Sequence, residues 1–311
     1  MALLALLLAL LAAEPETYDL AGQIVPETRA SVSLFGATTP FSTSTLSDLR
    51  GRFEFRKLLA GTYTLAVFVP SRGELRQTIE VGPSLADPKG RVAVTVDMRD
   101  SKLLSEEVLR RRHMVPAREL TIPDRARQEY ANAQKMLSKR DVPAAIAHLD
   151  KAVEMAPQFS AAWNNLGTIA YQSRDYARAE KHFRESLEQD PEAFEPLVNL
   201  GGALLSLEKF DEAMKYNLHA VLSRPNDALA NSQTGMNYFY LGDLDRALQY
   251  LNRAKRLDPA HFSHPQLLLA EIHLRRDNRA AAAEELADFL ARHPDWPQAD
   301  KMREAIAKLR Q

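Results

Sequence analysis

The sequence contains no cysteine among its 311 residues. A disulfide framework, a thiolate metal site and a redox thiol are therefore excluded. An excess of charge is also lacking, since 40 basic and 41 acidic residues give a formal net charge of -1. A strongly basic surface for nucleic acid is not predicted from such a balance. The sequence also lacks an apolar run of about 20 residues, the length that a membrane-spanning helix needs.

The longest apolar run is short and stands at the start, in residues 1–13, MALLALLLALLAA. It ends in small residues before Glu14-Pro15, which is typical of a signal peptide cleaved after Ala13, although a basic segment before the run is missing. The alternative is a buried leucine-rich helix. We therefore expect export to a periplasmic or extracellular compartment, without a stable transmembrane span after signal removal and without a lipoprotein-type anchor.

Short catalytic motifs are absent as well. The chain has no glycine-rich phosphate loop ending in Lys-Ser or Lys-Thr, no His-Glu-x-x-His and no Gly-x-Ser-x-Gly. We predict no enzymatic activity, no cofactor and no metal. An enzyme subunit with a site assembled from distant residues remains an alternative.

The clearest positive pattern is a period in the prolines. Pro157, Pro191, Pro225 and Pro259 are each 34 residues apart, and Pro294 follows after 35. A fixed step of this size is typical of a solenoid. Within residues 160–191, two clusters of apolar and small residues flank Arg174-Asp175, which predicts two helices joined by a turn.

Two small residues in that copy explain how its helices would pack. Gly167 and Ala179 leave room for the helices to approach each other, and both positions recur along the chain. The matching residues are Gly201 and Gly235 for the first, and Ala145, Ala213, Ala247 and Ala282 for the second.

The pattern Trp163…Leu166-Gly167…Ala179…Phe183…Pro191 resembles the tetratricopeptide repeat (TPR) family. The resemblance implies an all-α superhelical solenoid of five repeats with a closing helix at residues 295–311. The repeats are expected at residues 126–157, 160–191, 194–225, 228–259 and 263–294.

Between residues 18 and 98 the apolar period changes to two, which predicts strands. Alternation is found in residues 31–35, 52–55, 62–67, 78–81 and 91–96, separated by glycine-containing turns. Six or seven short strands in about 80 residues predict a small antiparallel β-sandwich. The whole chain is thus expected to be a β + α protein of two domains.

The segment 47–65 resembles the carboxypeptidase regulatory-like family. It combines a polar turn with Gly51, an aromatic strand with Phe53 and Phe55, and the sequence Ala60-Gly61-Thr62-Tyr63. The resemblance covers residues 18–98 and implies a transthyretin-like sandwich without a peptidase site. We interpret the aromatic residues as core; the alternative is a sugar-binding face. Residues 101–123 are expected to form a linker with a short helix and the basic run Arg110–His113. We interpret this run as a solvated helix end; the alternative is a contact with an anionic partner or with membrane headgroups.

The TPR resemblance also implies where a partner would bind. Ligands of that family lie along the concave face formed by the first helices of the repeats. The positions that match are Tyr130, Gln134, Asn164, Thr168, Tyr171, Val198, Leu205, Met236, Phe239 and Tyr240. Of these, Met236, Phe239 and Tyr240 would form an adaptable apolar patch; alternatively they pack against the closing helix or the sandwich. A carboxylate clamp is not expected, because Asn165 and Asn199 lack converging lysine or arginine neighbours.

The spacing of 34 also relates His148, His182, Tyr216 and Tyr250. We predict that these four rings form a ladder along the second helices. Metal binding by His148 and His182, or by His261 and His264, is not expected, because two imidazoles without a carboxylate make a poor site.

These observations lead to two hypotheses. The first is an exported, non-enzymatic scaffold that binds a protein or peptide partner of the cell envelope in its concave groove. The alternative is a carbohydrate-binding envelope protein that acts through the N-terminal sandwich.

Overall fold

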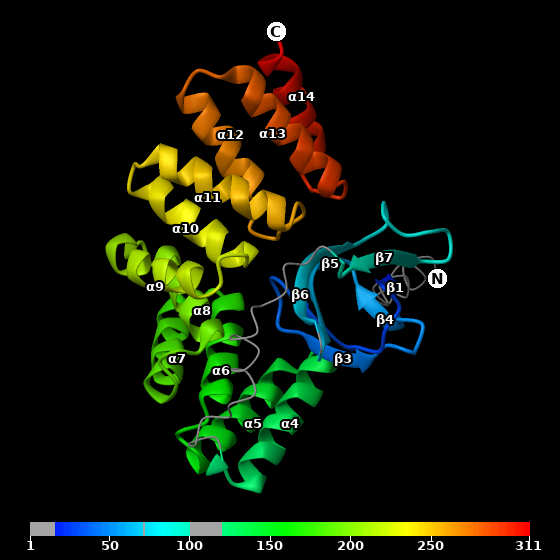
Figure 1. The fold of residues 1–311 in the computed structure, drawn as a ribbon, viewed down its shortest axis with the longest axis vertical. Helices are drawn as coiled ribbons and strands as arrows, with labels where there is room; N and C mark the ends of the chain where they lie inside the picture. Colours follow the sequence, from blue (N-terminus) through cyan, green and yellow to red (C-terminus); the bar gives the residue numbers. More distant parts are fainter. Residues whose placement is uncertain (1–15, 71, 100–119) are drawn as a thin grey trace, which may run out of the picture.

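The computed structural model describes residues 16–70, 72–99 and 120–311. The predicted signal peptide, most of the predicted linker and its basic run lie outside the described residues. Within the described part, an N-terminal β-sandwich precedes a helical solenoid, which confirms the predicted fold class (Figure 1). No helix in this part is long and apolar enough to span a bilayer.

The sandwich consists of two small sheets. Their strands are β1 (Thr17–Val25), β2 (Ser31–Gly36), β3 (Ser42–Leu46), β4 (Arg52–Leu59), β5 (Gly61–Val69), β6 (Gly73–Val81) and β7 (Arg91–Asp97). One sheet has the order β4-β1-β7 and the other the order β3-β2-β5-β6. The neighbouring strands are antiparallel except for β1 and β7, which pair in parallel, so the prediction of an antiparallel arrangement is wrong for this pair.

The core of the sandwich lies between the sheets and is made by the residues that alternate along the strands. It includes Phe53, Phe55, Tyr63, Leu65 and Val67, all buried as predicted. Strands β1 and β3 were not predicted. In β1 the alternation is interrupted by Gly22, where an added Cβ would overlap the Phe53 ring, and in β3 no residue is fully buried.

Eleven helices are described in the solenoid. They are α4 (Asp124–Ser138), α5 (Val142–Met155), α6 (Ser160–Gln172), α7 (Tyr176–Gln189), α8 (Phe194–Ser206), α9 (Phe210–Ser223), α10 (Ala228–Tyr240), α11 (Leu244–Leu257), α12 (Pro265–Arg275), α13 (Arg279–Arg292) and α14 (Ala299–Leu309). Ten of them pair as successive hairpins, and α14 packs on α13 at the end. Several of the first helices end at a short turn before an Asp or Asn that caps the second helix, as Asp175 does by accepting from the Arg178 N–H at 3.1 Å.

The small marker residues work as predicted. A Cβ added to Gly167 would lie 2.5 Å from the Phe183 ring, and one added to Gly235 would lie 2.7 Å from Leu251. The five alanines of the second helices are fully buried. The second, third and fourth hairpins therefore close with a side chain of the second helix lying directly on the backbone of the first, at Gly167, Gly201 and Gly235.

The turn inside each hairpin contains one residue in the left-handed region. These residues are Arg140, Arg174, Glu208, Gly242 and Asp277, with φ between 57° and 84°, and only one of them is glycine. A residue with a side chain is strained in this conformation. The repeat thus imposes its turn geometry even where the sequence does not favour it.

We expect the substitution Arg174→Gly to stabilise the solenoid. Arg174 is exposed with φ 62°, so glycine relieves strain without removing a buried contact. The gain in unfolding free energy is about 0.5–1 kcal/mol after the greater chain entropy of glycine is subtracted. Urea denaturation followed by circular dichroism measures it. The matched control is Ser173→Gly, since Ser173 has an ordinary φ of -84° and should gain nothing; equal gains from both variants would contradict the strain argument.

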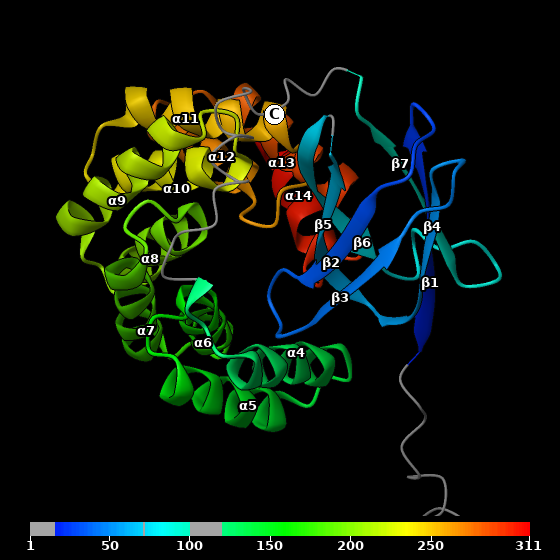
Figure 2. The ribbon, with the colours of Figure 1, turned by 60° about the horizontal axis from the view of Figure 1, so that its bottom comes forward.

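The solenoid curves around the sandwich. Figures 1 and 2 show the helices as an arc with the four-stranded sheet facing its concave side, close to α4 at one end and to α13 at the other. Strand β3, one edge of this sheet, contacts α4. Strand β6, the opposite edge, contacts the last three repeats, as described next. The groove that the sequence analysis assigned to a partner is therefore partly filled by the chain itself.

Candidate functional site: the concave face of the solenoid

One face of β6 carries the contacts with the last three repeats. Arg76, Thr78 and Glu80 are two residues apart and point away from the sandwich core, whereas Ile79 and Val81 point into it. Each of the three outward residues meets a different repeat. The strand thus lies across the ends of several helices and not along a single one.

The first of these contacts is an ion pair. The Arg76 guanidinium lies 3.1 Å from the Glu195 carboxylate near the start of α8. Arg224, at the end of α9, lies 3.2 Å from the same carboxylate, and its guanidinium stands 3.8 Å from the centre of the Phe194 ring. Glu195 therefore joins a strand of the sandwich to a neighbouring helix of the solenoid.

The second contact is buried. The Asp258 carboxylate accepts hydrogen bonds from the backbone N–H of Thr78 at 2.8 Å and from its hydroxyl at 2.7 Å. Burial raises the pKa of Asp258 above its usual value, while the two hydrogen bonds act in the opposite direction. Because Thr78 lies on the outer edge of the sheet, its N–H has no partner strand, and Asp258 takes that place.

The third contact involves a buried histidine ring. His293 Nδ1 lies 3.1 Å from the Glu80 carboxylate, and Glu80 also accepts from the Thr62 hydroxyl at 2.9 Å. Behind His293, the His264 ring lies at 4.6 Å with an edge-to-face geometry. Asp295 then accepts from the Ser84 N–H at 3.2 Å, and an added Cβ on Gly82 would lie 2.5 Å from the same carboxylate.

The first two repeats contact the sandwich differently. Arg140, in the turn after α4, donates to the Tyr63 hydroxyl at 3.1 Å and lies 4.4 Å from the centre of the Phe41 ring. Gln172, at the end of α6, donates to the Gly36 carbonyl at 2.9 Å. These contacts lie at the turns inside the hairpins, whereas those of β6 lie between hairpins. The sandwich therefore crosses the concave face diagonally.

The predicted groove residues of the first two repeats are mostly held by neighbours in the solenoid. Tyr130 packs on Phe159 and accepts from Asn165 at 3.2 Å. Asn164 accepts from Asn199 at 3.0 Å, and the Thr168 hydroxyl bonds the Asn164 carbonyl at 3.0 Å. The remaining residues of these repeats are Tyr171, whose hydroxyl lies 3.4 Å from that of Ser206, and Gln134, which is exposed.

The predicted groove residues of the third and fourth repeats differ sharply in exposure. Val198 and Leu205 are buried, and so is Phe239, whereas Met236 is half-buried against the core of the third repeat. Tyr240 alone is exposed, at 51%. The expected patch of Met236, Phe239 and Tyr240 is thus divided between core and surface, with a single ring left accessible.

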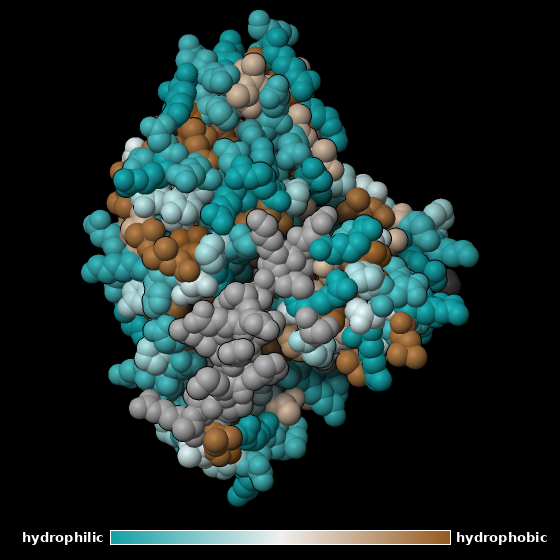
Figure 3. Space-filling model, viewed as in Figure 1, coloured by the Kyte–Doolittle hydropathy of each residue, from teal (hydrophilic) through white to brown (hydrophobic). Residues whose placement is uncertain are grey.

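Tyr240 belongs to a strip of residues at the turns, of which Phe210 and Leu241 were not predicted from the sequence. Its ring stacks on Phe210 at 4.8 Å and meets Phe239 at 5.5 Å, and the Arg275 guanidinium lies 4.5 Å from the Phe239 ring centre. Leu241 and Leu274, the chain neighbours of Tyr240 and Arg275, are 44% and 41% exposed. We call Phe210, Tyr240, Leu241, Leu274 and Arg275 the turn strip, because all five lie at the turns inside the last three hairpins. Figure 3 shows hydrophobic residues gathered over α9 and α10 on a largely hydrophilic face.

The predicted ladder of rings is wrong. Among the described residues, no ring contact joins any two of its four members. His148 instead pairs with Glu129 at 2.5 Å, His182 stacks on Trp163 at 5.6 Å, and Tyr250 stacks on Tyr238 at 5.6 Å. The first helix of the same hairpin supplies these partners, so the rings turn toward it. Tyr216 contacts Arg184 of the preceding repeat.

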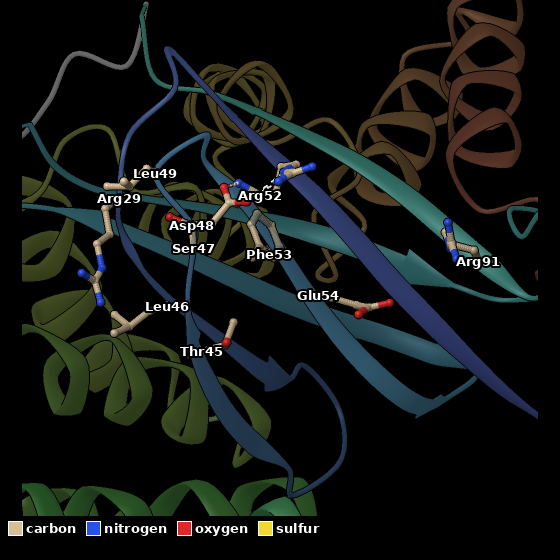
Figure 4. Close-up of a pocket in the computed structure, with 10 residues that line it drawn as sticks. All are labelled: Arg29, Thr45, Leu46, Ser47, Asp48, Leu49, Arg52, Phe53, Glu54 and Arg91. Carbon is tan, nitrogen blue, oxygen red and sulfur yellow. Dashed lines mark hydrogen bonds and ion pairs between the residues drawn. The ribbon is translucent and has the colours of Figure 1, made fainter.

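The sandwich has a surface depression of its own, with a volume of about 820 Å³. Figure 4 shows it between β3 and β4, with Arg29, Asp48, Arg52 and Glu54 among its lining residues. Its one aromatic residue, Phe53, is buried and offers no stacking platform for a sugar. In the described part of the chain, no three potential metal ligands of the types His, Asp and Glu converge.

Comparison with known families agrees with the helical architecture. Residues 130–194, 170–232 and 228–261 each match a family model described as a tetratricopeptide repeat. The solenoid is therefore built from tetratricopeptide repeats, a class of scaffold that presents an extended concave surface for protein–protein interaction.

Similar curated proteins match only part of this chain. The human cell division cycle protein 16 homolog is 28% identical over 113 residues, which cover 33% of this chain and 18% of that protein. Human trafficking protein particle complex subunit 12 is 27% identical over 146 residues, covering 45% of this chain and 20% of that protein. The chain thus spans about a fifth of the length of these relatives.

Among solved structures, MamA (residues 41 to the end) from Desulfovibrio magneticus RS-1 is similar, with a TM-score of 0.50 and 22% identity over 57% of this chain and 99% of that one. PilW, described as a widely conserved type IV pilus biogenesis factor, has a TM-score of 0.50 and 20% identity over 59% of this chain and 90% of that one. At these identities the similarity shows the helical fold alone.

Proposed function

We propose that the protein is an exported, non-enzymatic adaptor that binds a protein partner of the cell envelope on the concave side of its solenoid. The N-terminal sandwich would belong to the carboxypeptidase regulatory-like family and would have no peptidase site. The turn strip is the observation that carries this proposal. It joins an exposed tyrosine and an arginine, residue types that are enriched among interface anchors, to two exposed leucines that add apolar area beside them.

The position of the strip supports its assignment. Over the last three repeats the sandwich contacts the side between hairpins, through Glu195, Asp258 and His293. The strip lies at the turns inside the hairpins, on the other edge of the solenoid from these three contacts. A partner can therefore reach it while the sandwich stays in place.

Affinity capture from an envelope fraction tests the proposal. The double variant Tyr240→Ala, Leu274→Ala should retain less than a tenth of the partner captured by the unaltered protein, because truncating central anchors at an interface costs about 2 kcal/mol or more. The control is Leu222→Ala, which removes an even more exposed leucine outside the strip. Equal capture by all three proteins, with equal melting temperatures, would exclude the strip as the binding site.

Export is tested separately on the expressed full chain. Mass spectrometry of protein from the envelope fraction should find a mature chain that begins at Glu14. A cytosolic protein that retains residues 1–13 would contradict the export part of the proposal and leave the binding part intact.

A further inference from the structure

The sandwich and the solenoid have separate hydrophobic cores. The core cluster of the sandwich contains only residues between 18 and 98, and the four clusters of the solenoid contain only residues from 122 onward. The contacts along β6 are ion pairs and hydrogen bonds. Contacts of this kind join parts that are stable by themselves and can separate.

The solenoid recognises β6 as an extended strand. Its three receiving groups, Glu195, Asp258 and His293, meet Arg76, Thr78 and Glu80, which are the outward residues of alternating positions. Asp258 also accepts the backbone N–H at the sheet edge. Side chains at every second position together with an edge amide are the features by which proteins bind extended peptides. We call Glu195, Asp258 and His293 the strand seat.

The chemistry of the seat defines what fits it. Three pairs of groups meet at the seat. The Glu195 carboxylate lies opposite the Arg76 guanidinium, and the His293 imidazole lies opposite the Glu80 carboxylate. Between them, the buried Asp258 carboxylate accepts from the hydroxyl and the backbone N–H of Thr78. A matching segment carries a basic residue, then Ser or Thr two positions later, then an acidic residue after two more. The occupant in this structure, residues 74–82, has the sequence ELRQTIEVG.

We propose that the strand seat is a binding site for an extended segment of the partner with this alternating pattern, and that β6 is its intramolecular competitor. The inference rests on the proposed function in one respect, namely that the partner is a protein. Because β6 belongs to the same chain, it occupies the seat in most molecules. The partner segment binds only the molecules in which β6 has left the seat, so its apparent affinity is the intrinsic affinity multiplied by that fraction. Weakening β6 without altering the seat therefore raises that affinity.

The test uses the full-length protein and a fluorescent peptide with the sequence of residues 74–82, followed by fluorescence anisotropy. The variant Arg76→Glu places like charges at Glu195 and leaves all three seat residues unchanged. It should bind the peptide at least tenfold more tightly than the unaltered protein. The matched control Arg91→Glu makes the same charge change on an exposed position of β7, in the other sheet, and should bind like the unaltered protein.

Two further measurements make the result specific. A peptide with the charges of its Arg and its last Glu exchanged should not bind the Arg76→Glu variant. The double variant Arg76→Glu, Glu195→Arg restores opposite charges and should again exclude the original peptide. Circular dichroism and melting temperature confirm that each variant is folded.

Equal affinity of the unaltered protein, Arg76→Glu and Arg91→Glu, or equal binding of both peptides, would overturn this inference. If partner capture still depended on the turn strip, the proposed function would stand without it. Conversely, tighter peptide binding by Arg76→Glu than by Arg91→Glu would support the strand seat as a peptide-binding site, even if the variants of the turn strip captured partners as well as the unaltered protein does.

Discussion

Replacing Phe183 with alanine is expected to lower the free energy of unfolding by about 3–5 kcal/mol. The Phe183 side chain is 1% exposed and lies against the backbone of α6 at Gly167. Its removal leaves a cavity between the two helices of the second hairpin, because the helix on the other side has no side chain at Gly167 that could fill the space. The core of the neighbouring third repeat shares this ring, so the loss affects two repeats.

Urea denaturation and hydrogen exchange together measure this effect. The denaturation midpoint gives the loss in stability, and exchange should locate the faster opening in α6 and α7. The control is Phe35→Ala, in the sandwich, which removes the same side chain at a position that is 40% exposed and should cost less than about 1 kcal/mol. A loss below 1 kcal/mol for Phe183→Ala would show that the hairpin collapses around the missing ring.

Acidification is expected to destabilise the fifth repeat. Burial lowers the pKa of His261 to about 3, and burial together with the nearby His293 lowers that of His264 to about 4. Both pKa values lie below the ordinary value of 6.5, so the folded state binds fewer protons than the unfolded state between these limits. The stability that the two neutral rings contribute is therefore complete above pH 6.5 and falls progressively below it, until about pH 4 for His264 and about pH 3 for His261.

The slope of this loss is about 1.4 kcal/mol per pH unit for each ring inside its window. Denaturation at a series of pH values from 7 to 4 measures it. The variant His264→Asn should lower the pH dependence of the unfolding free energy by the contribution of one ring. Asparagine is chosen because it tolerates the left-handed backbone of position 264, where φ is 52°. The matched control makes the same substitution, His219→Asn, at a histidine whose side chain is 43% exposed. The same slope in all three proteins would contradict the assignment to His264.

The repeats could be predicted from the sequence because each one needs the same small and apolar residues at the same positions for its two helices to pack. In one hairpin Gly167 leaves room for the Phe183 ring and Ala179 is fully buried, and both positions recur at fixed spacing. The sheet strands with regular alternation could be predicted for the same reason. Strand β3, which has no fully buried residue, carries no such signal.

The docking of the sandwich could not be predicted. Thr78 and Asp258 are 180 residues apart, and neither stands in a pattern that distinguishes it from other polar residues at the surface. The seat therefore arises from the curvature of the whole solenoid, which no local motif encodes. Phe210 was missed as a member of the turn strip for a similar reason, because it begins the second helix of its hairpin and reaches the Tyr240 ring of the next repeat.

The diagonal crossing of the sandwich also has a mechanical consequence. A solenoid whose repeats touch only their neighbours behaves like a spring, since small rotations at each junction add up along its length. Here a single stiff sheet is fastened to the first repeat through Arg140 and to the fifth through His293. The sheet therefore fixes the distance between the first and fifth repeats. A ligand that tightens or opens the superhelix must first break the contact at Arg140 or the one at His293.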